Sequence, residues 1–188
     1  VRSILGLESV RSRWKAVRGV EPTETDGDAL YAILEPLLGE VAAERCQPVP
    51  GLVEFVAWLK EAGLGVGSTT GYPRDVMEAV MEGSARAGYS PDCAVWPLPG
   101  QRGRPAPWMM HECARRLGRF PLQAFVKIGD TPVDMEEARN AGAWAVGLSM
   151  SGNECGLDFD GYRALEPDRA AELRRAATAR LARAGAHF

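Results

Sequence analysis

The stretch KIGDTPVDMEEARNAG, residues 127–142, decides the fold of this chain. It joins a short, mostly apolar run at residues 124–128 to a helix, since Thr131 suits the N-cap and Pro132 suits the first turn. Gly142 then ends the helix, because glycine accepts the left-handed conformation that is common at helix C-termini. A buried strand that passes through a short turn into a helix is the repeating unit of α/β proteins.

The same alternation of strand and helix continues on both sides of this stretch. Further short apolar runs predict strands at residues 64–69, 93–96 and 143–148. Amphipathic segments predict helices at residues 52–62, 73–87, 105–117 and 169–184. Strands and helices that alternate with short connections form a parallel sheet with right-handed crossovers. We therefore expect an α/β fold with a Rossmann-like, three-layer core around a parallel sheet.

The N-terminal part has a different pattern. Residues 1–48 are predicted to be helical without a strand, and residues 28–44 carry an apolar stripe at helical spacing. Proline and glycine at residues 48–51 then interrupt the chain. The sequence therefore predicts a partial helical accessory domain at residues 1–48 and an α/β core at residues 49–188. The stripe is explained equally well by a dimer contact and by burial inside the helical domain.

The composition is that of a globular protein and limits the classes of partner. Hydrophobic residues make up 46% of the 188 residues, and no apolar stretch reaches the length of a membrane span. The net charge is −3 and the arginines are mixed with acids, so neither a nucleic acid nor a membrane is expected as a partner. The four cysteines form no CxxC pair, which favours reduced thiols and a cytoplasmic location. Trp58, Trp96, Trp108 and Trp144 are expected to pack in or near the core.

Two segments that could contact an anion follow predicted strands. In a wound parallel sheet, ligands bind beyond the carboxyl ends of the strands. In GSTTGY, residues 67–72, small residues let backbone N–H groups approach an anion at the start of a helix. In G-R-P, residues 103–105, the arginine stands between two backbone-restricting residues and can be aimed at phosphate-like oxygens. The alternatives are an ordinary strand-to-helix turn and a solvated loop arginine.

Two carboxylates follow the strand predicted at residues 124–128. Asp130 falls at the strand end, and Asp134 falls in the first turn of the next helix. Carboxylates placed in this way converge on one point, which suits a hard divalent cation. The alternative is helix capping, in which Asp134 only complements the helix dipole.

The motifs together resemble those of a known enzyme family. GDTPVDMEEARNAG, residues 129–142, resembles the fourth motif of the haloacid dehalogenase superfamily, and Thr70 stands where that superfamily has its second-motif Ser or Thr. The succession of GSTTGY, GRPAPWM and KIGDTPVDMEEARNAGAWAVG resembles the phosphonoacetaldehyde hydrolases in particular. Most of the superfamily has a lysine as its third motif, whereas this family uses the arginine of G-R-P, as at Arg104.

This resemblance implies a reaction and a cofactor. The family cleaves the carbon–phosphorus bond of phosphonoacetaldehyde to acetaldehyde and phosphate, through an imine and an aspartyl-phosphate. A magnesium ion would be held by Asp130 and by a nucleophilic aspartate, with Asp134 supporting the metal through its waters. The helical domain would be a cap, and the protein would be a homodimer formed through it.

The same resemblance assigns the substrate contacts. Thr70 and the amide of Gly71 would hydrogen-bond the phosphoryl oxygens, and Tyr72 would line the pocket. Arg104 would bind the phosphoryl group and neutralise its charge as it transfers. Thr70, Arg104 and Asp134 are therefore the expected catalytic side chains.

Two groups that the family's reaction needs are not found in the sequence. The D-x-A-G-T first motif with the nucleophilic aspartate is absent. Of the three lysines, Lys15 and Lys60 look like surface helix residues, and Lys127 lies within the strand before Asp130. The expected explanation is an N-terminally truncated sequence, which would be catalytically inert as an isolated fragment.

Two other classes share part of this chemistry. A haloacid dehalogenase-type phosphatase or phosphomutase uses an aspartyl-phosphate without an imine-forming lysine, but Arg104 in place of the third-motif lysine argues against it. A phospho-receiver domain also combines carboxylates, a threonine and magnesium, but it has neither the G-R-P element nor a helical cap.

Overall fold

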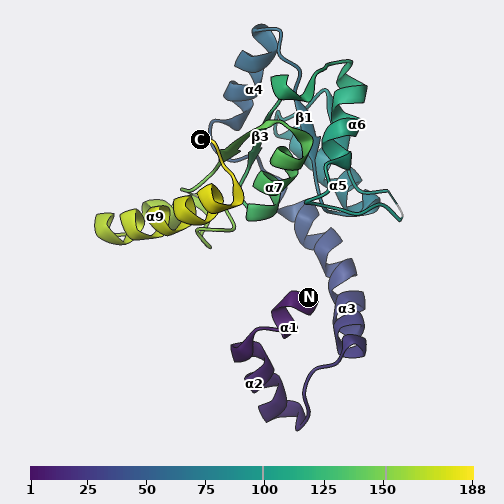
Figure 1. Cartoon of the computed structure of the whole chain (residues 1–188), viewed down its shortest axis with the longest axis vertical. Coiled ribbons are helices and arrows are strands. Elements are labelled where there is room, and N and C mark those ends of the chain that lie inside the picture. The colour runs from purple at the N-terminus through teal and green to yellow at the C-terminus, as the bar shows by residue number, and fades with distance from the viewer. Residues whose placement is uncertain (99, 151) are drawn as a thin grey trace.

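The structure is a computed structural model that describes residues 1–98, 100–150 and 152–188, apart from the side chains of residues 2, 3, 43 and 75. In chain order the helices and strands are α1 Arg2–Leu5, α2 Glu8–Arg18, α3 Glu24–Glu44, α4 Leu52–Glu61, β1 Gly67–Thr69, α5 Arg74–Arg86, β2 Cys93–Val95, α6 Trp108–Leu117, the 3-10 helix η1 Leu122–Ala124, β3 Val126–Gly129, α7 Pro132–Ala141, β4 Trp144–Gly147, α8 Phe159–Arg163 and α9 Pro167–Ala184. Figure 1 shows α4 to α7 gathered around the strands, while α1 and α2 lie apart from them.

The strands confirm the predicted α/β class but are arranged in two pairs. β1 pairs in parallel with β2, and β3 pairs in parallel with β4. Within the described residues these pairs form two sheets instead of the single sheet expected, because β1 is not hydrogen-bonded to β3. A side chain bridges the two pairs instead, since Lys127 Nζ of β3 donates to Thr69 Oγ1 of β1 at 2.6 Å.

Helix α7 lies in the larger of two buried clusters. Met135 and Ala138 of α7 and Ala145 of β4 are fully buried, and Leu181 of α9 is 2% exposed. Met110 of α6 belongs to the same cluster. Full burial of a methionine or leucine side chain stabilises the fold by about 1.5–3 kcal/mol. This packing on β4, α6 and α9 fixes the first turn of α7, which follows directly from β3.

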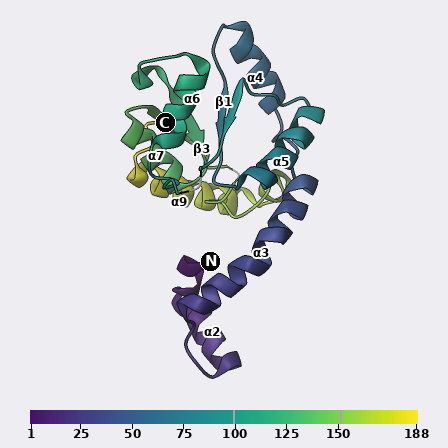
Figure 2. The same ribbon diagram turned by 90° about the vertical axis from the view of Figure 1, so that its right-hand side faces the viewer.

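Helix α3 starts earlier than predicted because a capping box precedes it. The N–H and hydroxyl of Thr23 donate to Asp26 Oδ2 at 2.8 and 2.6 Å, so the helix begins at Glu24. Figure 2 shows α3 running from α5 out to α2. Most of the apolar stripe of α3 is exposed within this chain, at Leu30, Ile33, Leu34 and Leu37, whereas Leu38 is half-buried.

The expectation that the tryptophans pack in the core is wrong for three of them. Trp58, Trp108 and Trp144 are 59%, 51% and 47% exposed. Trp144 alternates in β4 with the buried Ala145, so its ring points to the opposite face, where it lies 5.0 Å from the ring of His187.

The C-terminal residues lie along β4. The His187 N–H donates to the carbonyl of Ala145 at 2.8 Å, and the Gly147 N–H donates to the carbonyl of Phe188 at 2.8 Å. These bonds satisfy backbone groups on one edge of the β3–β4 sheet. No helix in the described part of the chain is both long enough and apolar enough to cross a membrane.

Candidate active site

Arg104 is held at the carboxyl ends of β1 and β3 by three different residues. Its Nε donates to Glu137 Oε2 at 3.0 Å, and its Nη2 donates to the carbonyl and the hydroxyl oxygen of Thr69, both at 2.7 Å. Its Nη1 forms an ion pair with Asp134 Oδ1 at 3.2 Å. The guanidinium is therefore fixed in plane and direction, with Nη1 as its least committed nitrogen.

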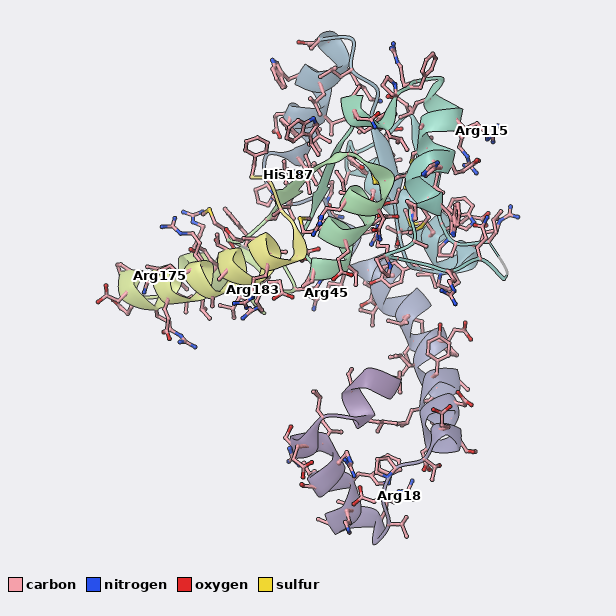
Figure 3. All side chains as sticks on the ribbon, viewed as in Figure 1. Arg18, Arg45, Arg115, Arg175, Arg183 and His187 are labelled. Atoms are coloured by element: carbon pink, nitrogen blue, oxygen red, sulfur yellow. The ribbon has the colours of Figure 1, made fainter. Side chains whose placement is uncertain are left out.

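Arg104 differs in its surroundings from most arginines of this chain. Its side chain is only 18% exposed. Figure 3 shows arginines of α2, α6 and α9 that project from separate parts of the molecule, and their side chains are exposed, at Arg18, Arg115, Arg175 and Arg183. The solvated-loop alternative for Arg104 therefore does not describe its environment.

Lys127 is a site residue that sequence reasoning missed. Its side chain, 10% exposed, points from β3 toward β1 and α7, where Nζ contacts Thr69 Oγ1 at 2.6 Å, Glu137 Oε2 at 3.0 Å and Asp134 Oδ1 at 3.3 Å. One signal was present, because a lysine within an apolar strand needs a buried partner of opposite charge. Nothing in the sequence named that partner.

Glu137 was also missed. It lies one turn after Asp134 on α7, is fully buried, and holds Arg104 and Lys127 through the same oxygen, Oε2. Its other oxygen, Oε1, has no hydrogen-bond partner among the described residues. Two cations and two carboxylates thus make a network with no net charge.

Asp134 is both a helix cap and a member of this network. The Thr131 hydroxyl donates to Oδ2 at 2.5 Å, while Oδ1 faces Arg104 and Lys127. Burial raises the pKa of Asp134, but the hydrogen bond from Thr131 and the charges of Lys127 and Arg104 lower it more, so the pKa lies below its ordinary value of 3.8. The capping alternative therefore describes this residue, which also contacts both cations, while its metal-binding and catalytic roles stay predictions.

Asp130 comes directly before Thr131 in the chain, and its hydrogen-bond partners differ from those of Asp134. The backbone N–H and the side-chain amide of Asn153 donate to its Oδ2 at 2.8 and 3.0 Å. Among the described residues no group of three or more His, Cys, Asp or Glu is arranged to hold a metal ion. The magnesium site expected at Asp130 and Asp134 therefore stays a prediction.

The GSTTGY segment places its two threonines differently. Thr69 contacts Arg104 and Lys127, whereas Thr70 continues the strand, with its N–H donating to Val95 at 3.0 Å and its hydroxyl accepting from the Tyr72 N–H at 3.2 Å. Gly71 and Tyr72 are exposed in the turn that follows.

The structure therefore brings only part of the predicted set into direct contact. Arg104 and Asp134 are ion-paired. Thr70 adjoins Thr69, which contacts Arg104, and Asp130 adjoins Thr131, which contacts Asp134. Arg104 and Asp134 are therefore part of one cation–carboxylate network, Thr70 and Asp130 are next to its members in the chain, and the roles of all four stay predictions.

Comparison with known proteins identifies the class to which the chain belongs. Residues 6–142 match the family model of the haloacid dehalogenase-like hydrolases, so the chain belongs to that class. Over all 188 residues it is 47% identical to a phosphonoacetaldehyde hydrolase of Nitratidesulfovibrio vulgaris, of which it spans 67%. It is 38% identical to a phosphonoacetaldehyde hydrolase of Bacillus cereus, of which it spans 71%.

A solved structure gives the same result. The crystal structure of a phosphonoacetaldehyde hydrolase-like protein from Oleispira antarctica matches with a TM-score of 0.90 at 35% identity, and the match covers 100% of this chain and 68% of that one. Within the haloacid dehalogenase-like hydrolases the chain is a member of the phosphonoacetaldehyde hydrolase family. The resemblance seen in the sequence motifs is confirmed.

Proposed function

We propose that this protein hydrolyses the carbon–phosphorus bond of phosphonoacetaldehyde and releases acetaldehyde and phosphate. The observation that carries the proposal is the fixed Arg104 guanidinium, which lies beside the Thr69–Thr70 strand end and is only 18% exposed. A rigid cation in this position stabilises the charge of a phosphoryl group during transfer. The relatives named phosphonoacetaldehyde hydrolase, matched over the whole chain, support the same substrate.

The phosphoryl group would be bound between Arg104 and the GSTTGY turn. In this proposal Nη1 of Arg104 contacts a phosphoryl oxygen, and the Thr70 hydroxyl and the Gly71 N–H donate to others. A Cβ placed on Gly71 would meet no described atom within 4 Å, so its backbone is open to a ligand. Tyr72, 42% exposed, would line the substrate side of the pocket.

Magnesium is the proposed cofactor. The carboxylates of Asp130 and Asp134 differ in how well their surroundings allow them to bind it. Asp134 already faces two cations, whereas the hydrogen bonds that Asp130 accepts within the described residues come from neutral N–H groups of Asn153. Asp130 would therefore bind the ion directly, and Asp134 would act through the metal's waters. When bound, the ion supplies positive charge that offsets the negative charge of the phosphoryl group.

The imine-forming lysine and the nucleophilic aspartate are proposed to lie outside residues 1–188. Lys15 is exposed and Lys60 is paired with Asp92 at 3.1 Å, both on the surface. Lys127 is enclosed by two carboxylates and a hydroxyl, so its amine is not available to an aldehyde. None of these three lysines fits the role of an imine former.

We further propose the division into a partial cap at residues 1–48 and a catalytic core at residues 49–188 that lacks its first strand. The proposal is supported by the separation of β1 from β3 and by the position of α1 and α2 apart from the strands (Figure 1). The exposed stripe of α3 supports a homodimer formed through the cap. The cysteines of the described residues form no disulfide, which is in keeping with a cytoplasmic location.

The test is acetaldehyde release from phosphonoacetaldehyde by the protein that the complete reading frame encodes. Borohydride added with substrate should inactivate it, because reduction traps the imine. Arg104→Met should lower kcat by about 100- to 1,000-fold. Arg102→Met is the matched control, since Arg102 is exposed two positions away, and it should leave kcat unchanged. Phosphate release from phosphomonoesters without borohydride sensitivity would instead identify a phosphatase.

A further inference from the structure

Glu137 is a buried charge that packing alone does not require. It lies on α7 among apolar residues, and its neighbours Met135 and Ala138 are also fully buried. Burial of a carboxylate destabilises a fold unless opposite charges and hydrogen bonds offset the lost hydration, and an apolar side chain of similar volume carries no such cost. The only contacts of its carboxylate with described residues are those of Oε2 with Arg104 and Lys127.

The bond from Arg104 Nε is the one that sets the direction of the guanidinium. Nε lies on the rigid fork next to the flexible stem, so an acceptor at 3.0 Å fixes the rotation of the whole group. Nη2 is held as well, because it donates to the carbonyl and hydroxyl oxygens of Thr69. With Nε and Nη2 anchored, Nη1 is the nitrogen that has no hydrogen bond of its own within the described residues and faces Asp134, whose Oδ1 lies 3.2 Å away.

Lys127 reduces the extent to which the negative charge of Glu137 offsets the positive charge of Arg104. If Arg104 were the only cation here, Glu137 and Asp134 together would outweigh its charge and weaken its attraction for an anion. Lys127 contacts both carboxylates, at 3.0 and 3.3 Å, and so offsets the second negative charge. Arg104 can then be anchored by a carboxylate and still attract a phosphoryl group.

From this geometry we infer that Glu137 and Lys127 are positioning residues for Arg104. Glu137 orients the guanidinium through Nε, and Lys127 offsets the charge of Glu137 so that Nη1 can bind a phosphoryl oxygen. The inference rests on the proposed function for the role of Arg104. The two residues act through Arg104 and do not themselves touch substrate.

Two double variants with the same net charge, made in the protein that the complete reading frame encodes, test the inference. Lys127→Met combined with Glu137→Gln keeps an acceptor oxygen near Nε, whereas Lys127→Met combined with Glu137→Met removes it. The first should retain kcat within a few-fold, and the second should lose about 10- to 100-fold in kcat with little change in KM, because small misplacements of a catalytic group cost this much. The single variant Lys127→Met should also lose kcat, since Glu137 then neutralises Arg104.

If Glu137 had a purely structural role, the two double variants would have the same kcat. Both double variants remove the buried ion pair and should be folded, which thermal unfolding checks. If they show equal kcat, Glu137 does not position Arg104 and the inference is wrong.

An NMR measurement distinguishes an error in the positioning role of Glu137 from an error in the proposed function. The Nε–H resonance of Arg104 in an NMR spectrum of residues 1–188 should be protected from solvent exchange in the chain itself and in the Gln double variant, and unprotected in the Met double variant. An unprotected resonance in the unmodified chain overturns the inference. Protected resonances together with no turnover of phosphonoacetaldehyde by the complete protein would refute the proposed function alone.

Discussion

At the scale of single residues, Lys127 and Asp134 show how neighbours set the chemistry of a side chain. Lys127 has acceptors on three sides, and its side chain is 10% exposed. Lys15 and Lys60 are 61% and 38% exposed. Three lysines of one chain therefore differ in their access to a reagent, although the residue type is the same.

Amine labelling checks this difference directly. An N-hydroxysuccinimide ester at neutral pH should acylate Lys15 and Lys60 of the folded chain and react with Lys127 at least about tenfold more slowly, because reaction there requires local opening. Peptide mass spectrometry measures the labelled fraction at each site. The control is the same labelling in urea, where all three lysines should react alike. Equal labelling of Lys127 and Lys60 in the folded chain would contradict the enclosed position of Lys127.

Asp134 predicts how stability depends on pH. Its pKa is lower in the folded chain than the ordinary 3.8, so the unfolded state binds more protons as the pH falls. The stability that Asp134 contributes is therefore fully present above the unfolded pKa and is lost as the pH falls through the folded one. Thr131→Val removes one cause of the lowered pKa and should destabilise the chain by about 1–2 kcal/mol at neutral pH.

The acid dependence distinguishes this effect from a general loss of packing. Urea unfolding of Thr131→Val should show a smaller decrease of stability toward acid than the unmodified chain, because the pKa of Asp134 lies nearer its ordinary value. Thr131→Ser keeps the hydroxyl and should behave like the unmodified chain. If the valine and serine variants share the same acid dependence, the Thr131 bond does not lower the pKa of Asp134.

At the scale of elements, β3 and α7 approach each other closely in the site. A Cβ added to Gly129 would lie 2.4 Å from Asp134 Cβ, a distance that no packed structure accommodates. Gly129 is therefore required for space, since the turn from strand to helix brings Asp134 over the end of β3. This close approach is what places a first-turn carboxylate within reach of Arg104.

Gly129→Ala should force the two elements apart. We expect a loss of about 2–3 kcal/mol in the free energy of unfolding, measured by urea denaturation, because overpacking shifts backbone that cannot relax. Gly103→Ala is the matched control, since a Cβ there meets no described atom within 4 Å, and it should change stability by less than about 0.5 kcal/mol. A small effect at Gly129 would mean that α7 can move without cost.

At the scale of the whole molecule, the described chain divides into a packed core and an extended helical arm. The core clusters involve α6, α7, α9 and the strands, whereas α2 contributes no buried residue. Figure 1 shows α1 and α2 joined to the rest only through α3. An 11-residue helix in which no residue is fully buried is marginal in water.

Hydrogen exchange should follow this division. Amides of α2 should exchange at rates within about tenfold of an unstructured peptide, while amides of β3, β4 and α7 should exchange only through near-global unfolding. Exchange followed by mass spectrometry of residues 1–188 measures both sets at once, with α7 as the internal reference. Strong protection of α2 at low protein concentration would show contacts that this arrangement lacks. Protection that rises with concentration would support the dimer through α3.

The network of Arg104, Lys127, Asp134 and Glu137 also has a role at this scale. Both Arg104 and Lys127 contact Thr69 of β1, and both contact carboxylates of α7, which follows β3. These side chains therefore link the β1–β2 pair to the β3–β4 pair, which share no backbone hydrogen bond in the described residues. The candidate site lies where the two halves of the core meet.

The sequence by itself determined the features that depend on local patterns. The strand, cap and helix around Thr131 and Pro132 follow from residue periodicity and capping, and the observed α7 and β3 agree with the predicted ranges to within two residues at each boundary. Arg104 was identified as the arginine of the G-R-P element, which resembles the third motif of the family, since its local signal alone was weak. The family followed from these same motifs, since motif residues keep their spacing along the chain.

Only the tertiary structure decided which side chains meet. Lys127 and Thr69 are 58 positions apart, and Arg104 and Glu137 are 33 apart, so no local pattern links them. A lysine in an apolar strand and a glutamate one helical turn after Asp134 each predict only that a partner exists. The packing of β3 and α7 against the end of β1 selects that partner, because a buried charge is stable only where opposite charges from other elements reach it.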